Sequence, residues 1–125
     1  MIYGIGTDIV AVARMAQFRE RHGERVFGRL LASSEIPACQ ASVHPERFLA
    51  KRFAAKEALG KALGTGIRSP VLLTAISVDH DDLGKPKFSF STELAAYLSE
   101  RHLTVHLSIS DEREYALAYV IAEQR

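Results

Sequence analysis

The sequence lacks most of the features that mark a disulfide-stabilised or membrane-spanning protein. Its one cysteine, Cys39, cannot form an internal disulfide, and we interpret it as an incidental thiol in a reducing compartment. No apolar run approaches the roughly 20 residues that a membrane-spanning helix needs. No positive segment precedes an apolar stretch near Met1, so we expect no secretory signal and a cytoplasmic location.

An excess of charge of one sign is lacking too. Lys and Arg number 16 and Asp and Glu number 15, which gives a formal net charge of +1. The chain therefore has no overall field that would recruit nucleic acid or an anionic membrane, and we expect neither as a partner. An electrostatic partner would have to bind a local patch of charge.

What is present suits one globular domain over residues 1–125. Hydrophobic residues make up 47% of the chain and charged residues 25%, close to the average for soluble domains. There is no internal repeat, low-complexity segment or linker that would divide the chain.

The pattern of apolar residues predicts an α+β fold with a mostly antiparallel sheet packed against a long helix. We expect the order β-α-α-β-β-α-β-β. Residues 33–45 should form a connector with about one helical turn. The predicted strands are residues 2–10 (ending near Asp8), 74–80, 86–90, 103–109 and 115–122, and the predicted helices are residues 12–31 (with a possible break at Gly23), 46–63 and 92–102.

The helix over residues 46–63 is the first candidate site. Glu57 and Lys61 lie one turn apart, which is the spacing of an ordinary surface ion pair. Gly60 lies between them, although glycine disfavours helix, so a close backbone approach is an alternative reason for it. The helix also carries four cations, which would suit an anionic ligand: Lys51, Arg52, Lys56 and Lys61.

Two further features have both a structural and a functional interpretation. The run Gly64-Thr65-Gly66 could be a helix C-cap, or a loop whose backbone N–H groups approach a phosphate or a planar base. Asp8 could cap the following helix, or act as a functional acid. With a distant glutamate it could hold Mg²⁺, which prefers oxygen ligands.

Two polar stripes complete the candidates. His106, Ser108 and Ser110 alternate along a predicted strand as a polar outer face would, and this spacing disfavours a Ser-His-Asp triad with Asp111. Arg14, Arg21 and Arg25 fall on one helical stripe, which is either a solvated face or a surface for an acidic protein.

Together these pieces resemble the holo-acyl-carrier-protein synthases, the small bacterial type of 4′-phosphopantetheinyl transferase. The segment FAAKEALGKALGTG at residues 53–66 resembles the signature helix of that family closely, and GIGTDI at residues 4–9 resembles its N-terminal motif. Gly84-Lys85-Pro86 fits the hairpin turn of the family, and residues 106–119 resemble its closing strand pair. Residues 33–47 match no motif.

The resemblance implies transfer of the phosphopantetheine arm of coenzyme A to a serine of an apo acyl carrier protein, with fatty acid biosynthesis as the usual pathway. It implies catalysis by Asp8, Glu57 and Lys61, with Mg²⁺ on the two carboxylates and Lys61 near the phosphates. It further implies a homotrimer with its sites at the subunit interfaces. The remaining implied contacts are Gly64, Thr65, Gly66 and Pro86 near the adenosine end of coenzyme A, His106 near its phosphate groups, and Arg14, Arg21 and Arg25 on the acidic carrier.

Three other functions remain as alternatives. The chain could be a non-catalytic coenzyme A-binding module, a docking protein for an acidic helix, or a hydrolase of a nucleotide pyrophosphate. The proton of the attacking serine could pass to a metal-bound water or to one of the carboxylates.

Overall fold

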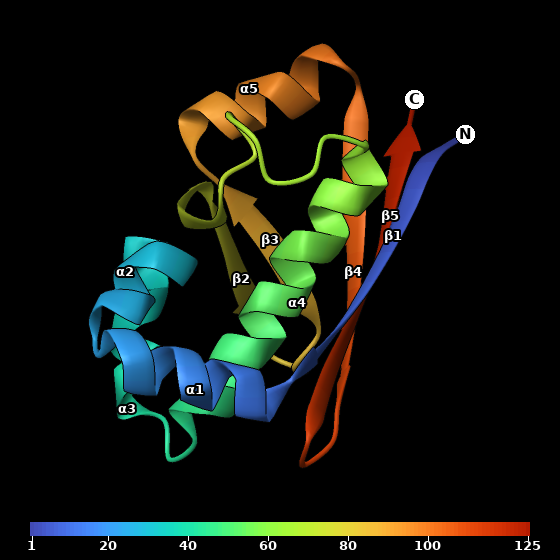
Figure 1. Ribbon diagram of the computed structural model, residues 1–125. Coiled ribbons are helices and arrows are strands. Elements are labelled where there is room, and N and C mark those ends of the chain that lie inside the picture. Colours follow the sequence, from blue (N-terminus) through green and yellow to red (C-terminus); the bar gives the residue numbers. More distant parts are fainter.

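The computed structural model describes all 125 residues and is built around a three-stranded antiparallel sheet. The strands are β1 (Ile2–Ala11), β5 (Tyr115–Gln124) and β4 (Leu103–Asp111), in the order β1-β5-β4. The long helix α4 (Pro45–Leu63) lies across one face of this sheet (Figure 1). The two chain ends lie side by side because β1 and β5 pair along their full length.

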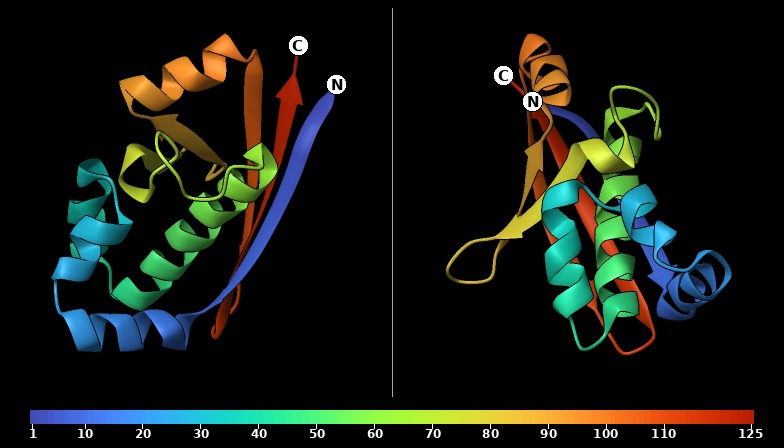
Figure 2. Two further views of the ribbon diagram at one scale, coloured as in Figure 1. Left: turned by 45° about the horizontal axis from the view of Figure 1, so that its top comes forward. Right: turned by 90° about the vertical axis from the view of Figure 1, so that its left-hand side faces the viewer.

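The remaining elements surround α4. Helices α1 (Val12–His22), α2 (Arg25–Leu30) and α3 (Ile36–Ala41) gather beside the beginning of α4. A two-stranded sheet of β2 (Ile76–His80) and β3 (Pro86–Phe90) leads into α5 (Thr92–Glu100). Figure 2 shows the tip of the β2–β3 hairpin projecting away from α4. Two short 3-10 helices, Ser33–Glu35 and Leu73–Ala75, complete the fold.

The antiparallel α+β fold confirms the sequence prediction, with differences in detail. The helix predicted over residues 12–31 is divided at Gly23, whose φ of 62° ends α1. The connector over residues 33–45 contains more helix than the one turn expected, because a 3-10 turn runs directly into α3. The five strands form two sheets, since β2 and β3 pair only with each other.

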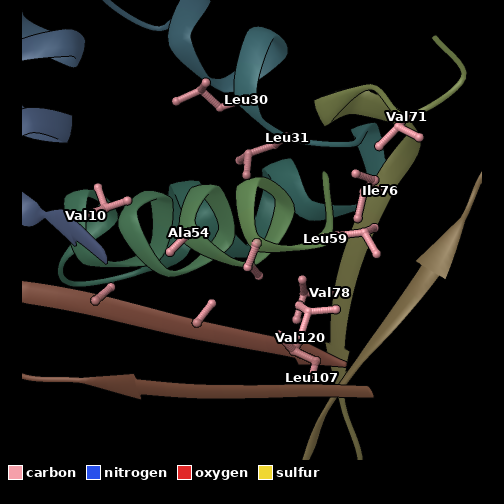
Figure 3. Packing of buried hydrophobic residues seen from close by; sticks show 14 of the residues in the cluster. Val10, Leu30, Leu31, Ala54, Leu59, Val71, Ile76, Val78, Leu107 and Val120 are labelled. Atoms are coloured by element: carbon pink, nitrogen blue, oxygen red, sulfur yellow. The ribbon is translucent and has the colours of Figure 1, made fainter. Parts of the chain in front are cut away.

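One hydrophobic core joins the layers. Alternate residues of β4 and β5 point toward α4, which contributes a run of alanines and leucines to the same cluster. Figure 3 shows Leu59 of α4 close to Ile76 and Val78 of β2, with Val120 and Leu107 of the three-stranded sheet next to Val78. Cys39 is buried in this cluster, and burial raises the pKa of its thiol to about 11, which keeps the thiol protonated at neutral pH.

A buried ion pair connects α4 to the segments packed on its other side. The side chain of Lys56 is fully buried, and its Nζ lies 2.6 Å from Oε1 of Glu35. Its ammonium also donates to the carbonyl oxygens of Leu30 and Leu73, each at 2.9 Å. Glu35 in turn accepts a hydrogen bond from the backbone N–H of Val78. Each buried charge is therefore fully partnered.

This ion pair corrects the prediction that four cations of α4 suit an anionic ligand. Lys56 is committed to Glu35, and burial lowers its pKa while the carboxylate opposes that shift. Arg52 is mostly buried and lies 3.5 Å from Oε2 of the same carboxylate. Glu35 belongs to the part of the sequence that matched no motif, so nothing in the sequence pointed to it as the partner.

Two glycines let β1 approach α4 more closely than any other residue would. A Cβ atom added to Gly4 would lie 2.0 Å from the carbonyl oxygen of Ala62, and one added to Gly6 would lie 2.0 Å from that of Ala58. Real Cβ atoms do not approach backbone atoms so closely, so the strand would have to move away. Asp8 follows on the same face of β1, since side chains alternate along a strand.

Replacing Gly6 by alanine should therefore destabilise the protein strongly. The methyl group must push β1 away from α4, and we expect a loss of about 2–3 kcal/mol in the free energy of unfolding by urea. Gly28 is the matched control, because a Cβ there meets no atom within 4 Å. Gly28→Ala should be neutral or slightly stabilising within α2. Equal stabilities for the two variants would contradict the close approach.

Candidate active site

Asp8 lies within β1 and faces α4. The strand continues to Ala11, and it is Ala11 that precedes the first turn of α1, with no side-chain cap. The interpretation of Asp8 as a helix cap is therefore wrong. The side chain of Asp8 is 17% exposed, so its carboxylate is partly open to solvent.

Lys61 of α4 reaches across to β1. Its Nζ lies 3.0 Å from Oδ1 of Asp8 and 2.9 Å from the carbonyl oxygen of Thr7. The expected surface ion pair with Glu57 does not form, because Lys61 pairs with Asp8 instead. A residue of the signature helix and one of the N-terminal motif thus meet in space, although 53 positions separate them in the sequence.

Glu57 lies one turn before Lys61 and shares its electrostatic environment with Asp8. Burial raises the pKa of Glu57, and the nearby charge of Asp8 raises it further. Lys61 and Arg14 oppose this rise. Two carboxylates that repel one another at a partly open site favour a bound cation.

The donor set of the site fits Mg²⁺. Asp8 and Glu57 supply hard carboxylate oxygens, and Mg²⁺ in proteins is commonly held by one or two carboxylates together with waters and substrate phosphates. No group of three or more His, Cys, Asp or Glu side chains that could hold a metal occurs in the chain. A closed, all-protein metal site is therefore absent, and a phosphate ligand could complete the coordination.

The loop Gly64-Thr65-Gly66 ends α4, and the C-cap interpretation is confirmed. Gly64 has a φ of 77°, and the backbone N–H groups of Thr65 and Gly66 both donate to the carbonyl oxygen of Gly60. These groups are therefore not free to hold a phosphate. Gly60 is required because its Cβ would lie 2.9 Å from the backbone of Gly66, which confirms the close approach predicted there.

His106 and Pro86 lie away from the carboxylates in the same chain. His106 points to the opposite face of the sheet from Asp8, in register with the exposed Ile5 through Ile121 of β5. Its Nε2 lies 3.1 Å from Oε1 of Glu123, so Ser108 is not its partner and no triad forms. Pro86 begins β3, in the separate two-stranded sheet.

The arginines divide between two helices. Arg14 and Arg21 of α1 border a shallow depression of about 200 Å³ whose other walls include Phe18 and His22. Arg25 belongs to α2, because α1 ends before Gly23. The prediction that all three arginines lie on one helical stripe is therefore wrong.

Arg14 connects this surface to the carboxylates, a contact that the sequence did not predict. Its guanidinium lies 5.4 Å from the centre of the Phe53 ring, and Phe53 is one turn before Glu57 on α4. The spacing of Phe53, Glu57 and Lys61 at four-residue intervals is the signal that could have placed them on one face of α4.

Glu57→Gln should stabilise the protein slightly at neutral pH. Because folding raises the pKa of Glu57, its ionisation costs folding free energy above that raised pKa. The cost falls with pH and is absent below the ordinary value of 4.5, where folded and unfolded chains are both protonated. We expect a gain of less than about 1 kcal/mol at pH 8, since the site is open to solvent, and none near pH 4. Urea unfolding at both pH values tests this, with Glu112→Gln in the exposed turn between β4 and β5 as control, and a loss of stability at pH 8 would contradict it.

Comparison with known proteins agrees with this geometry. The 4′-phosphopantetheinyl transferase superfamily matches residues 4–120. No helix has the length and apolarity needed to cross a membrane. Holo-[acyl-carrier-protein] synthases of Azoarcus sp. (strain BH72) and Dechloromonas aromatica are 56% and 60% identical, over 100% and 98% of both chains respectively.

Solved structures show the same relationship. The holo-[acyl-carrier-protein] synthase of Neisseria meningitidis is 46% identical, with a TM-score of 0.96 over 99% of this chain and 100% of the other. That of Bacillus anthracis, in complex with CoA (3′,5′-ADP), is 37% identical, with a TM-score of 0.83 over 100% of this chain and 99% of the other. The chain therefore belongs to the 4′-phosphopantetheinyl transferase superfamily and, within it, to the holo-[acyl-carrier-protein] synthase family.

Proposed function

We propose that this protein transfers the 4′-phosphopantetheine arm of coenzyme A to a serine of an apo acyl carrier protein and releases adenosine 3′,5′-bisphosphate. The observation that carries the proposal is the meeting of Asp8, Glu57 and Lys61 between β1 and α4. The names of its relatives support the reaction, and the relatives from Bacillus anthracis and Helicobacter pylori are described in complex with coenzyme A.

The residues of the site suit a displacement at a pyrophosphate. The serine oxygen of the carrier attacks the phosphorus that bears the pantetheine arm, and the bond to the leaving phosphate oxygen breaks. The hydroxyl proton of the serine passes to a water or to one of the carboxylates. Negative charge grows on that oxygen, and the Lys61 ammonium is available to stabilise it. Because the nucleophile comes from the carrier, no nucleophile of this chain is needed.

Asp8 and Glu57 are the residues that would hold Mg²⁺. When bound, Mg²⁺ neutralises charge on the pyrophosphate and acts as a Lewis acid. Binding of coenzyme A alone does not require two carboxylates beside its phosphates, which would repel them, so the pair favours the transferase over a silent binding module.

The transfer can be measured directly on the carrier. Purified protein, Mg²⁺, coenzyme A and an apo acyl carrier protein should give a carrier heavier by one phosphopantetheine in a mass spectrum. EDTA should prevent the gain, and Glu57→Ala should slow it about 100-fold or more. Glu93→Ala, which removes an exposed carboxylate of α5, is the control and should react normally.

A carrier that stays at its apo mass, with several carriers tried, would contradict the proposal. Coenzyme A binding would then distinguish a binding module from a docking protein. Release of the arm to water without a carrier would instead indicate a pyrophosphate hydrolase.

We propose a homotrimer, supported by the sheet face that α4 does not cover. Large apolar side chains on this face are at least a third exposed, and a group of exposed apolar side chains on one face is typical of a protein–protein interface. We define this as the open sheet face; its members are Tyr3, Ile5, Ile9, Tyr115, Leu117 and Tyr119.

His106 lies beside the open sheet face, on the opposite side of the sheet from Asp8. We propose that His106 contacts the phosphate groups of coenzyme A bound at a neighbouring subunit. Gly64, Thr65, Gly66 and Pro86 would lie near the adenosine end. Since the N–H groups of Thr65 and Gly66 are used by α4, this loop would contact the nucleotide through other atoms.

Light scattering should give a mass three times that of the 13.8 kDa chain. Tyr119→Glu places a charge in the open sheet face and should yield a smaller species with little transfer activity, because its sites would be incomplete. A folded, fully active monomer of the unaltered protein at micromolar concentration would contradict the trimer.

We propose that Arg14, Arg21 and Arg25 dock the acidic carrier, which supplies fatty acid biosynthesis in the cytoplasm. Local positive charge on α1 gives a nearly neutral protein a patch that can steer an acidic partner. The contact of Arg14 with Phe53 places this patch beside the carboxylates, where the carrier serine must arrive.

Reversal of one of these charges should weaken the binding of the carrier and not that of coenzyme A. Arg21→Glu should raise the KM for the carrier about tenfold or more, with a weaker salt dependence, and leave the affinity for coenzyme A in metal-free buffer unchanged, because Arg21 is not among the charges that act on Glu57. Arg101→Glu on the distant end of α5 is the control. An unchanged KM for the carrier would contradict the docking role.

A further inference from the structure

Lys61 forms an ion pair with Asp8, one of the two carboxylates that would bind the proposed metal. Its ammonium satisfies two of its three donors, with Oδ1 of Asp8 at 3.0 Å and the carbonyl oxygen of Thr7 at 2.9 Å. Both acceptors belong to β1, and the close approach of β1 to α4 brings them within reach of the lysine. A cation already neutralises Asp8 from within the chain.

We infer that Lys61 competes with a divalent cation for the Asp8 carboxylate, and that it must turn away from Asp8 before the cation binds there. This inference rests on the metal role proposed above. The ion pair would block cation binding at Asp8 until Lys61 turns away. The ammonium that leaves Asp8 would then be available for the pyrophosphate of coenzyme A. Metal binding and phosphate binding would then favour one another through one side chain.

The exposure of the two partners fits such an exchange. The side chain of Lys61 is 55% exposed, whereas that of Asp8 is 17% exposed. The lysine can therefore swing into solvent at little cost, since exposed ion pairs contribute little, while Asp8 keeps its place on β1. Lys56 offers the contrast, because its buried ammonium has three partners and no path to solvent.

Arg14 provides the comparison that distinguishes exchange of Lys61 for a cation at Asp8 from a general effect of positive charge near the site. Arg14 and Lys61 both lower the pKa of Glu57 electrostatically, so both charges are felt at the site. Only Lys61 forms an ion pair with Asp8. A general effect would make the two residues alike, whereas an exchange makes Lys61 the stronger competitor.

The inference is tested by measuring the affinity of the full chain for Mn²⁺. The protein is first freed of metal with EDTA, and no coenzyme A is present. Mn²⁺ replaces Mg²⁺ because free and bound Mn²⁺ are distinguished by electron paramagnetic resonance. Lys61→Met keeps most of the side chain without its charge and should bind Mn²⁺ about two- to fivefold more tightly than the unaltered protein. Lys61→Arg keeps the charge and should bind no more tightly, and Arg14→Ala should gain less than Lys61→Met.

The outcomes distinguish the competition by Lys61 from the metal role of Asp8 and Glu57. Unchanged or weaker Mn²⁺ binding by Lys61→Met, or an equal gain in Arg14→Ala, overturns the competition and leaves the metal role intact. Binding that survives Asp8→Asn together with Glu57→Gln overturns the metal role itself. Circular dichroism spectra and urea midpoints close to those of the unaltered protein establish that each variant is folded.

Discussion

The site depends on one packing constraint, the contact of β1 with α4 at Gly4 and Gly6. With no Cβ at these positions, the strand lies against the helix backbone at Ala58 and Ala62. The next inward residue is Asp8, which therefore meets the helix near Glu57 and Lys61. Any larger residue at either glycine would separate the two elements that share the site, so the glycines and the charged residues belong to one arrangement.

The opposite side of α4 is fixed by a different interaction. Lys56 is buried with Glu35 and bonds to two backbone carbonyls, so it holds the 3-10 turns and α2 against the helix. Lys56 and Glu57 are adjacent in sequence yet point to different surroundings, one to a closed ion pair and the other to an open site. A helix held on both sides cannot rotate, and this fixes the direction of Glu57 relative to β1.

The sequence predicted what depends on local pattern and on motifs within one segment. Helix over residues 46–63, the antiparallel strands and the spacing of Glu57 and Lys61 all follow from residues near one another in the chain. The missing parts depend on contacts between distant segments: Glu35 as partner of Lys56, Asp8 as partner of Lys61, and the sheet faces that part His106 from Asp8. Spacing alone also could not show that the N–H groups of Thr65 and Gly66 bond to α4.

A double-mutant cycle on transfer activity tests whether β1 and α4 bring Asp8 and Glu57 into one site. The values of kcat/KM for coenzyme A would be compared among the unaltered protein, Asp8→Asn, Glu57→Gln and the double variant. Groups that act as one unit lose most of their effect with the first substitution, so we predict that the activity of the double variant is little lower than that of the less active single variant. Losses of activity that multiply would show that the two residues act independently and would contradict a shared site.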